Sequence, residues 1–245
     1  MSGGNQLHLQ NGFILKSIQS EQDIDRLALF NKRIHEGEDL ETLVRMLIAA
    51  HPYGMPHHWL FIENAQDDRI VSSVALIPWK ISFCGVTLPV AELGFVGTDP
   101  AFRRQGLTRL LIEQFHRTVE RDGFVCSFLQ GIPFFYRQFG YEYALPLETH
   151  VNLKLSRIAA HQSSRLSVRL MRREDLPVIG ALYTTCMEAY PIHTKRSAAV
   201  WKYLLGPSLH TEMVHDTYCV EDRRRGVTAY FRIARYGFGE GLILD

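Results

Sequence analysis

One stretch of the sequence decides the fold: AELGFVGTDPAFRRQGLTR, residues 91–109. Its first half is apolar and ends at Asp99-Pro100, which predicts a strand that stops there. Its second half opens a segment over 101–122 whose apolar residues recur at helical spacing. The stretch therefore predicts a strand that leads directly into a long amphipathic helix.

The junction between this strand and this helix has the chemistry of an anion site. The first turn of a helix presents free backbone N–H groups and the positive end of the helix dipole. Gly106 allows an anion to approach the backbone closely, and the Thr108 hydroxyl can donate a hydrogen bond. Arg103, Arg104 and Arg109 add positive charge in a fork geometry that suits phosphate.

Strands and helices alternate on both sides of the junction. We expect strands at 13–18, 59–62, 70–83, 86–96, 124–129 and 141–155, and helices or helical turns at 20–30, 39–48, 101–122 and 133–139. The run at 124–129 is apolar throughout, which predicts a strand buried on both faces at the centre of a sheet.

The pattern of the first half returns in the second. A strand and a helix after Val168 echo residues 13–30, and a predicted hairpin over 218–233 echoes 59–81. We therefore expect four parts: a flexible N-terminal tail (1–12), a first domain (13–157), a polar linker (158–167) and a second, incomplete copy (168–245). A half-built sheet leaves an open edge, which favours an intact protein longer than this chain.

Composition excludes several classes of function. The net charge is +1, so no global field favours nucleic acid or an anionic membrane, and no apolar run is long enough to span a bilayer. The start of the chain is polar and unlike a signal peptide. The four cysteines include no CxxC pair and lie beside apolar runs, so we expect buried, reduced thiols and a cytoplasmic protein.

Two clusters carry weaker signals. His51, His57 and His58 share a loop, but no Cys, Asp or Glu accompanies them at ligand spacing, so we expect no metal and favour a loop near the substrate. Arg223–Arg225 could bind nucleic acid, but acidic neighbours and two flanking strands favour a solvated hairpin turn.

The junction resembles the acyl-CoA signature of the GNAT acyltransferases, [RQ]-x-x-G-x-[GA]. Arg103 matches its first position and Gly106 its glycine, whereas Thr108 departs from the final small residue. In that family the loop amides bind the pyrophosphate of CoA, and the preceding strand splays from its neighbour and pairs with the pantetheine arm. The resemblance thus implies these CoA-binding residues: Val96, Gly97, Thr98, Arg103, Arg104, Gln105, Gly106, Leu107, Thr108 and Arg109.

Catalytic roles follow from the same resemblance. PFFYRQFGY at 133–141 is similar to the family's FY-x-x-x-GF segment, whose tyrosine protonates the departing thiolate, and this implies Tyr136 as general acid. Some members use a glutamate on the splayed strand as the base, and Glu92 lies there. The alternatives are a packed aromatic for Tyr136 and a structural ion-pair partner for Glu92. A backbone N–H of Val96 or Thr98 could polarise the thioester carbonyl.

The overall layout is similar to the Eis-like (enhanced intracellular survival) acetyltransferases, which carry tandem GNAT domains. The resemblance implies an α/β GNAT fold, with a mixed, mostly antiparallel sheet between helices, that transfers acetyl from acetyl-CoA to a primary amine. It implies a small-molecule or peptide acceptor and no metal, and leaves a homo-oligomer open. Two alternatives stay open: an acyl-CoA-binding module without activity, and an acyltransferase for a longer chain.

Overall fold

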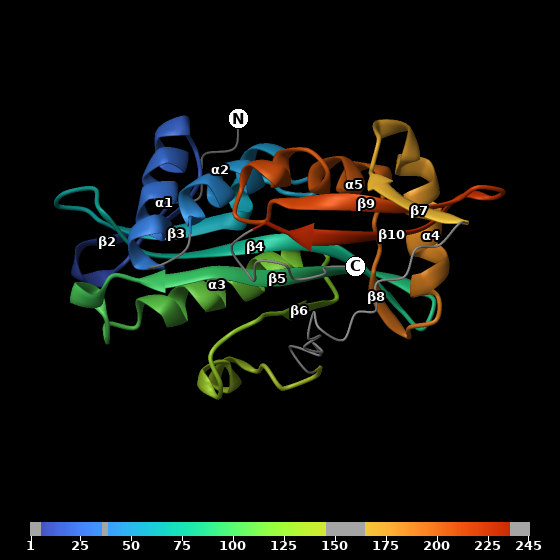
Figure 1. Cartoon of the computed structure of the whole chain (residues 1–245). Coiled ribbons are helices and arrows are strands. Elements are labelled where there is room, and N and C mark those ends of the chain that lie inside the picture. Colours follow the sequence, from blue (N-terminus) through green and yellow to red (C-terminus); the bar gives the residue numbers. More distant parts are fainter. Residues whose placement is uncertain (1–5, 36–38, 146–164, 236–245) are drawn as a thin grey trace.

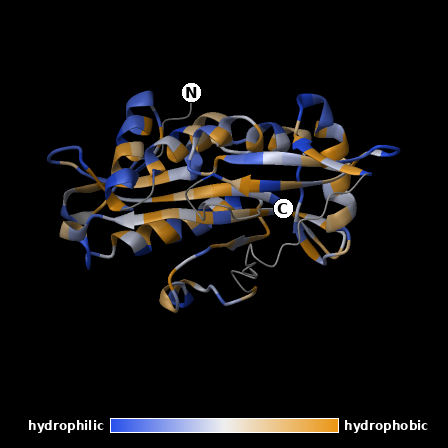
Figure 2. Cartoon of the chain, in the orientation of Figure 1, coloured by the Kyte–Doolittle hydropathy of each residue, from blue (hydrophilic) through white to orange (hydrophobic). Residues whose placement is uncertain are grey.

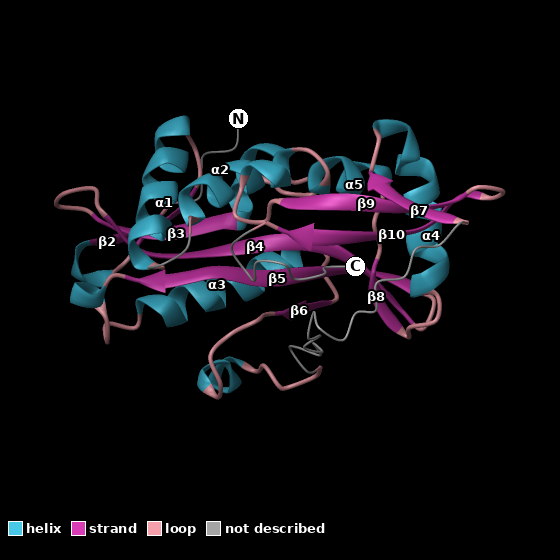
Figure 3. Cartoon of the chain, viewed as in Figure 1, coloured by secondary structure: helices cyan, strands magenta, loops and turns pink. Residues whose placement is uncertain are grey.

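The computed structural model of the chain describes residues 6–35, 39–145 and 165–235. The main sheet has the strand order β1-β2-β3-β4-β5-β6, with β8 added to the free stretch of β4 (Figures 1 and 3). Its strands are β1 (Leu7–His8), β2 (Phe13–Ser17), β3 (Trp59–Asn64), β4 (Ile70–Phe83), β5 (Val86–Thr98), β6 (Cys126–Phe128) and β8 (Ile192–Thr194). All described pairings in this sheet are antiparallel except β5 with β6, which confirms the mixed α/β fold.

Helices cover both faces of the main sheet. On one face α1 (Glu21–Ile34) and α2 (Leu40–Ala50) bury Leu27 and Val44 against Phe61 of β3. On the other face α3 (Leu107–Arg121) buries its apolar stripe, with Phe115 fully enclosed. Figure 2 shows hydrophobic colour along the central strands and hydrophilic colour at the loop tips, as burial of apolar surface requires.

Helix α1 shows why the predicted helices form where they do. Ser20 accepts a hydrogen bond from the backbone N–H of Asp23, and the Asp23 carboxylate accepts one from the backbone N–H of Ser20. This reciprocal cap satisfies two N–H groups that a helix start leaves free. The expected helix at 101–122, by contrast, begins only at Leu107, because Arg104 and Gly106 adopt positive φ values of 64° and 77°.

The prediction that 124–129 is a fully buried central strand is wrong. Strand β6 lies at the edge of the described sheet, and Val125 and Phe128 are 58% and 39% exposed. An apolar run indicates that its side chains need to pack against other elements. It does not indicate whether those elements lie on one side of the strand or on both. Of the strand expected at 141–155, residues 141–145 are not in a strand and 146–155 lie outside the described residues.

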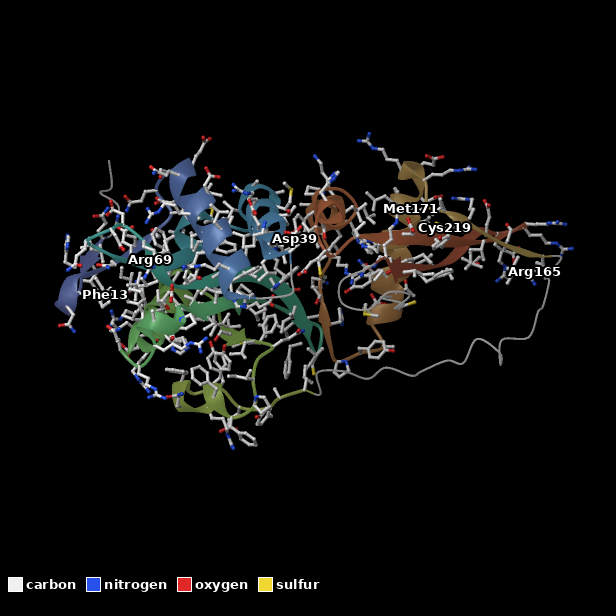
Figure 4. The ribbon with its side chains drawn as sticks, turned by 60° about the vertical axis from the view of Figure 1, so that its left-hand side comes forward. Phe13, Asp39, Arg69, Arg165, Met171 and Cys219 are labelled. Atoms are coloured by element: carbon white, nitrogen blue, oxygen red, sulfur yellow. The ribbon has the colours of Figure 1, made fainter. Side chains whose placement is uncertain are left out.

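A second sheet follows in the order β10-β9-β7 and is antiparallel throughout. Its strands are β7 (Leu166–Leu170), β9 (His215–Asp222) and β10 (Gly226–Ala234), and the same part of the chain contains the helices α4 (Leu176–Met187) and α5 (Ala198–Leu204). They match the strand, helix and hairpin expected after Val168, and Arg223–Arg225 form the hairpin turn. Figure 4 shows Met171 and Cys219 within this unit and Arg165 at its far end.

The two halves of the chain are joined through strand and core contacts. β8 pairs with β4, and Tyr203 of α5 belongs to the core beneath α1 and α2. The structure also orders two segments that we expected to be unstructured: β1 lies within the expected tail, and β7 begins at Leu166, inside the expected linker.

The expectation that all four cysteines are buried is wrong. Cys84, Cys126 and Cys186 are exposed, and Cys219 is buried. Each exposed cysteine lies beside apolar residues in sequence without being covered by them. Among the described residues, no helix is long and apolar enough to cross a membrane.

The packing of α1 on β5 depends on Gly97. A Cβ atom at this position would lie 2.8 Å from Cγ2 of Ile34, at the last residue of α1. We expect Gly97→Ala to lower the free energy of unfolding by about 1–3 kcal/mol, the usual cost of overpacking, as measured by urea denaturation. In Gly54→Ala the new Cβ would lie 3.4 Å from its nearest neighbour, so this control should lose far less stability. Equal stability of the two variants would contradict the packing argument.

Candidate active site

Strands β5 and β6 run side by side and then separate. They pair in parallel at Val90 with Cys126, Ala91 with Ser127 and Glu92 with Phe128. Beyond Glu92, β5 continues to Thr98 while β6 ends, and the pairing of β5 passes to β4 alone among the described residues. The outer edge of β5 from 93 to 98 therefore presents backbone groups with no described strand to pair with.

A β-bulge shapes this open edge. Gly94 pairs with Ala75 and Gly97 with Ser73, so two residues of β5 face one residue of β4. Phe95 has a φ of 52°, and its carbonyl accepts a hydrogen bond from the Ser73 hydroxyl at 3.3 Å. The bulge turns the backbone at the point where β5 loses contact with β6.

The backbone of Thr98 points toward the open side. The N–H of Asp99 donates to the Val71 carbonyl at 2.9 Å, so Asp99 faces β4. Polar groups alternate along a strand, so the N–H and C=O of Thr98 face away from β4. In agreement, the Thr98 carbonyl accepts from Nε of Arg103 at 3.5 Å. Val96, two residues earlier, precedes the paired position at Gly97 and lies in the bulge.

The expected anion loop follows directly. Gly106 is the N-cap of α3 in the left-handed conformation, and no side chain caps the helix there. Because a non-glycine residue is strained at this φ, glycine is required by the backbone itself. Arg103, Arg104, Gln105 and Arg109 are exposed around this helix start, whereas Leu107 is buried beneath it. The loop can therefore offer first-turn N–H groups and guanidinium groups to one anion.

Thr108, the residue that departs from the family signature, is held by the hydroxyl of Thr98, which in turn contacts the hydroxyl of Ser72. Its Oγ1 lies 2.8 Å from Oγ1 of Thr98, which lies 2.7 Å from Oγ of Ser72. This chain of hydroxyls ties the start of α3 to the ends of β4 and β5. The side chain is thus directed into the protein and fixes the loop, which the sequence signature could not show.

Glu92 and Phe128 form the last pairing between β5 and β6, and beyond it the two strands separate; we call this gap the wedge and Glu92 its apex. Its carboxylate accepts a 2.7 Å hydrogen bond from the indole N–H of Trp79. Burial raises the pKa of Glu92, and the bond from Trp79 opposes this shift by stabilising the carboxylate. No ion pair to Glu92 is present among the described side chains, so the ion-pair alternative lacks a described partner.

Tyr136 lies on the opposite face of the wedge. It belongs to the 3-10 turn at Phe135–Phe139 and packs against the core cluster beneath α3, whereas Trp79 packs on the α1–α2 side. Burial raises the pKa of its phenol, so the proton is retained at neutral pH. Gly131 leaves room for its ring, because a Cβ there would lie 2.5 Å from Cε2 of Tyr136.

Contacts join the helix start to the segment that carries Tyr136. Nη2 of Arg109 donates to the Gln138 side chain at 2.8 Å, and its guanidinium lies 5.0 Å from the ring centre of Phe139. The structure therefore brings the expected loop, the edge of β5 and the tyrosine segment to one region. Glu92 approaches the same region from the other face of the sheet.

Three supporting residues escaped the sequence reasoning. Trp79 and Ser72 act through Glu92 and Thr98, and both contacts depend on the β4–β5 register, which sequence does not give. The third, Tyr141, lies 2.8 Å from the Ser127 hydroxyl, and burial raises its pKa to about 12. Its place in the 133–141 motif was a usable signal, but the motif comparison singled out Tyr136.

The histidine loop acquires an acidic partner in the fold. Nε2 of His57 and of His58 lie 2.7 and 3.1 Å from the same oxygen of Asp122, at the end of α3. The N–H of Met55 donates to Nδ1 of His58, so the neutral ring carries its proton on Nε2, toward Asp122. Burial lowers the pKa of His58 to about 4, which keeps the ring neutral. Arg121 is also bonded to Asp122, so these residues form a hydrogen-bonded cluster. The ligand atoms of His57, His58 and Asp122 lie within 4.8 Å of one another, close enough to hold a metal ion, so the fold supplies the acidic partner that the sequence spacing did not show.

A pocket of about 550 Å³ lies elsewhere. It is lined by β1 and β2 residues such as Leu15, by His57 and by the second half of α3, including Arg117. None of the residues that we expect to bind CoA lines it.

Comparisons with known proteins identify the family of the first half of the chain. The acetyltransferase (GNAT) domain family matches residues 23–144. The chain is 32% identical over 130 residues to the N-acetyltransferase Eis of Mycobacterium tuberculosis and of Mycobacterium bovis, an alignment that covers 49% of this chain and 32% of each relative. The chain thus spans about a third of the length of the curated relatives it matches.

Solved structures share the fold over almost the whole chain. The N-myristoyltransferase of Saccharomyces cerevisiae with bound myristoyl-CoA aligns at a TM-score of 0.65 and 14% identity, covering 93% of this chain and 61% of that one. A probable N-acyltransferase of unknown function from Enterococcus faecalis aligns at 0.67 and 16%, covering 94% and 56%. At these identities the likeness shows the fold alone.

The hydroxyl chain gives a direct test of what Thr108 contributes. We expect Thr108→Val, which keeps the shape but removes the hydroxyl, to cost about 1 kcal/mol in urea unfolding, the usual worth of one hydrogen bond. Thr98→Val should cost a similar amount or more, because it breaks both bonds. If the two residues act through one chain, the double variant will cost less than the two single losses together. Strictly additive losses would contradict the chain.

Proposed function

Because residues 23–144 of this chain belong to the GNAT acetyltransferase family, we propose that the protein transfers an acetyl group from acetyl-CoA to a primary amine. One observation carries the proposal. β5 separates from β6 after Glu92, and its open edge leads into a glycine-capped, arginine-rich helix start. An extended ligand with an amide-bearing arm and a pyrophosphate fits this combination of strand edge and helix N-terminus.

The parts of the ligand are assigned by their chemistry. The pyrophosphate would lie at the residues from Arg103 to Arg109, where the first turn of α3 has free N–H groups and the arginines are exposed. The pantetheine arm would pair with the edge of β5 at 96–98, where the Thr98 backbone faces outward. The thioester would then lie near the bulge, at the apex of the wedge.

The reaction we propose is direct attack within a ternary complex. The amine nitrogen forms a bond to the acetyl carbon, and the bond from that carbon to the CoA sulfur breaks. Such a reaction depends mainly on holding the two reactants close and in line, which the wedge can do from its two faces. An outward N–H from Val96 or Thr98 would stabilise the negative charge that develops on the thioester oxygen.

Two proton transfers accompany the acyl transfer. Glu92, directly or through water, takes the proton that the ammonium group must lose, and its raised pKa suits a base near neutral pH. Tyr136 gives its proton to the departing thiolate, and its raised pKa keeps that proton available. Tyr136 packs on the α3 side of the sheet and Trp79, the partner of Glu92, on the α1–α2 side, so the two proton transfers are proposed to occur from different sides.

The acceptor is proposed only as a class: a small-molecule or peptide amine. We also propose that residues 168–245 form a second, incomplete GNAT-like unit and that the protein acts in the cytoplasm. The strand, helix and hairpin of the second sheet support the first of these proposals. The net charge of +1 gives no support for nucleic acid as a partner.

A longer acyl chain is the second candidate. Two solved neighbours in fold are yeast N-myristoyltransferases with bound myristoyl-CoA, and they show that this fold can bind a long acyl group. Comparing acetyl-CoA with myristoyl-CoA in the same release assay separates the two candidates.

The acid assignment is tested by Tyr136→Phe. We expect kcat to fall by about 10²–10⁴-fold, because the thiolate loses its proton donor, while the affinity for acetyl-CoA measured by calorimetry stays unchanged. Thiol release with a panel of amines reports turnover. Tyr141→Phe is the matched control and should keep kcat, and the reverse pattern would assign the acid to Tyr141. Wild-type binding without turnover would favour a non-catalytic module, and absence of binding would overturn the proposal.

The base assignment is tested by Trp79→Phe. Glu92 acts as a base when ionised, so activity falls as pH drops below its pKa. The Trp79 bond lowers that pKa, so its removal should shift the acidic limb of the kcat/KM profile upward by roughly one pH unit. Trp201→Phe, at an indole N–H without a partner, should leave the limb in place. An unmoved limb in Trp79→Phe would exclude Glu92 as the titrating base.

A further inference from the structure

A second pocket, of about 220 Å³, lies where β8 joins β4. Every residue that lines it is polar or a tyrosine: Tyr53, Lys80, Thr87, Tyr183, Thr184, His193, Thr194, Lys195, Arg196 and Ser197. None of these ten is acidic, although the whole chain has 26 acidic against 27 basic residues. The pocket is therefore a local concentration of positive charge in a nearly neutral protein.

The fold places two of these lysines at opposite positions of one strand pair. Ile81 pairs with Thr194, so the next residues outward, Lys80 and Lys195, lie opposite one another, and the Lys195 N–H donates to the Lys80 carbonyl at 2.7 Å. Like charges directly opposite in an antiparallel pair destabilise it. Neither lysine forms an ion pair with a described residue that would relieve this repulsion.

Two of the neighbouring cations lie against aromatic rings. The Arg196 guanidinium lies 4.2 Å from the ring centre of Tyr183 and 4.9 Å from that of Trp201, which fixes its plane. The Lys80 ammonium lies 5.1 Å from the ring centre of Tyr53. A fixed guanidinium beside two ammonium groups and several hydroxyls is a donor set typical of phosphate recognition.

This pocket is separate from the loop at Arg104–Gly106. Thr87 in the pocket and Thr98 at the loop lie near opposite ends of β5. At ~3.3 Å per residue, the strand carries them about 35 Å apart. One phosphate group cannot contact both places.

We propose that the pocket between β4 and the β8–α5 segment binds a phosphate group, free or carried by a small molecule. Lys80 comes from the first sheet and Lys195 and Arg196 from the second half of the chain, so a bound phosphate joins the two halves. The phosphate neutralises the Lys80–Lys195 pair and receives hydrogen bonds from their ammonium groups. The inference does not depend on acyl transfer at the wedge.

The test uses inorganic phosphate on the whole chain, at constant ionic strength set with chloride. We expect phosphate to raise the melting temperature of the wild type, and calorimetry to give a dissociation constant that weakens about ten-fold or more in Lys195→Gln and in Lys80→Gln. Lys202→Gln, at an exposed lysine of α5 outside the pocket, should bind as the wild type does. Arg104→Gln should also bind normally, which separates this site from the proposed CoA loop.

A second readout follows from the repulsion itself. Without phosphate, Lys195→Gln should melt at a higher temperature than the wild type, because the like-charged pair is gone. The same phosphate concentration should raise its melting temperature less than that of the wild type. Equal phosphate affinity in wild type and Lys195→Gln would overturn the proposal. Loss of binding in Arg104→Gln alone, or absence of binding to the wild type, would overturn it as well. Free phosphate and a phosphate ester are separated by repeating the titration with glycerol phosphate.

Discussion

The rest of the structure depends on how firmly β4 holds β5. The two strands pair at eleven positions, from Ser72 with Thr98 to Phe83 with Val86, while β6 pairs with β5 at three. Because β4 fixes β5 along its whole length, β5 can leave β6 without losing its place in the sheet. The separation leaves an open strand edge, and this is the edge at which we propose that the pantetheine arm pairs.

β4 also holds the start of α3 in place. The hydroxyl chain from Ser72 through Thr98 to Thr108 connects β4 to α3, and Gly106 allows the turn between them. The departure at Thr108 from the family signature therefore has a local compensation. The glycine or alanine of the family signature leaves space beneath the loop. The threonine of this chain fills that space and forms a hydrogen bond to Thr98.

The β4 strand also contacts the second half of the chain directly. Beyond the end of its pairing with β3, β4 accepts β8, and Tyr203 of α5 enters the core under α1 and α2. A single long strand thus supports the wedge with Glu92 at its apex and the basic pocket at Lys80. Both places rest on β4: Ile77 pairs with Glu92 and Lys80 with Pro89, whereas the loop after Thr98 lies at the far end of β5.

The sequence by itself determined the elements that local chemistry controls. The run at 91–109 predicts a strand, a positively charged junction and an amphipathic helix, because periodicity and glycine placement act over a few residues. Sequence could not place β6, whose apolar run fits a sheet centre as well as an edge, nor show that Asp122 meets His57 or that Lys80 faces Lys195. Those pairings are decided by strand register and by packing between residues far apart in the chain. Only the tertiary structure sets them, because their energies depend on neighbours that no local pattern specifies.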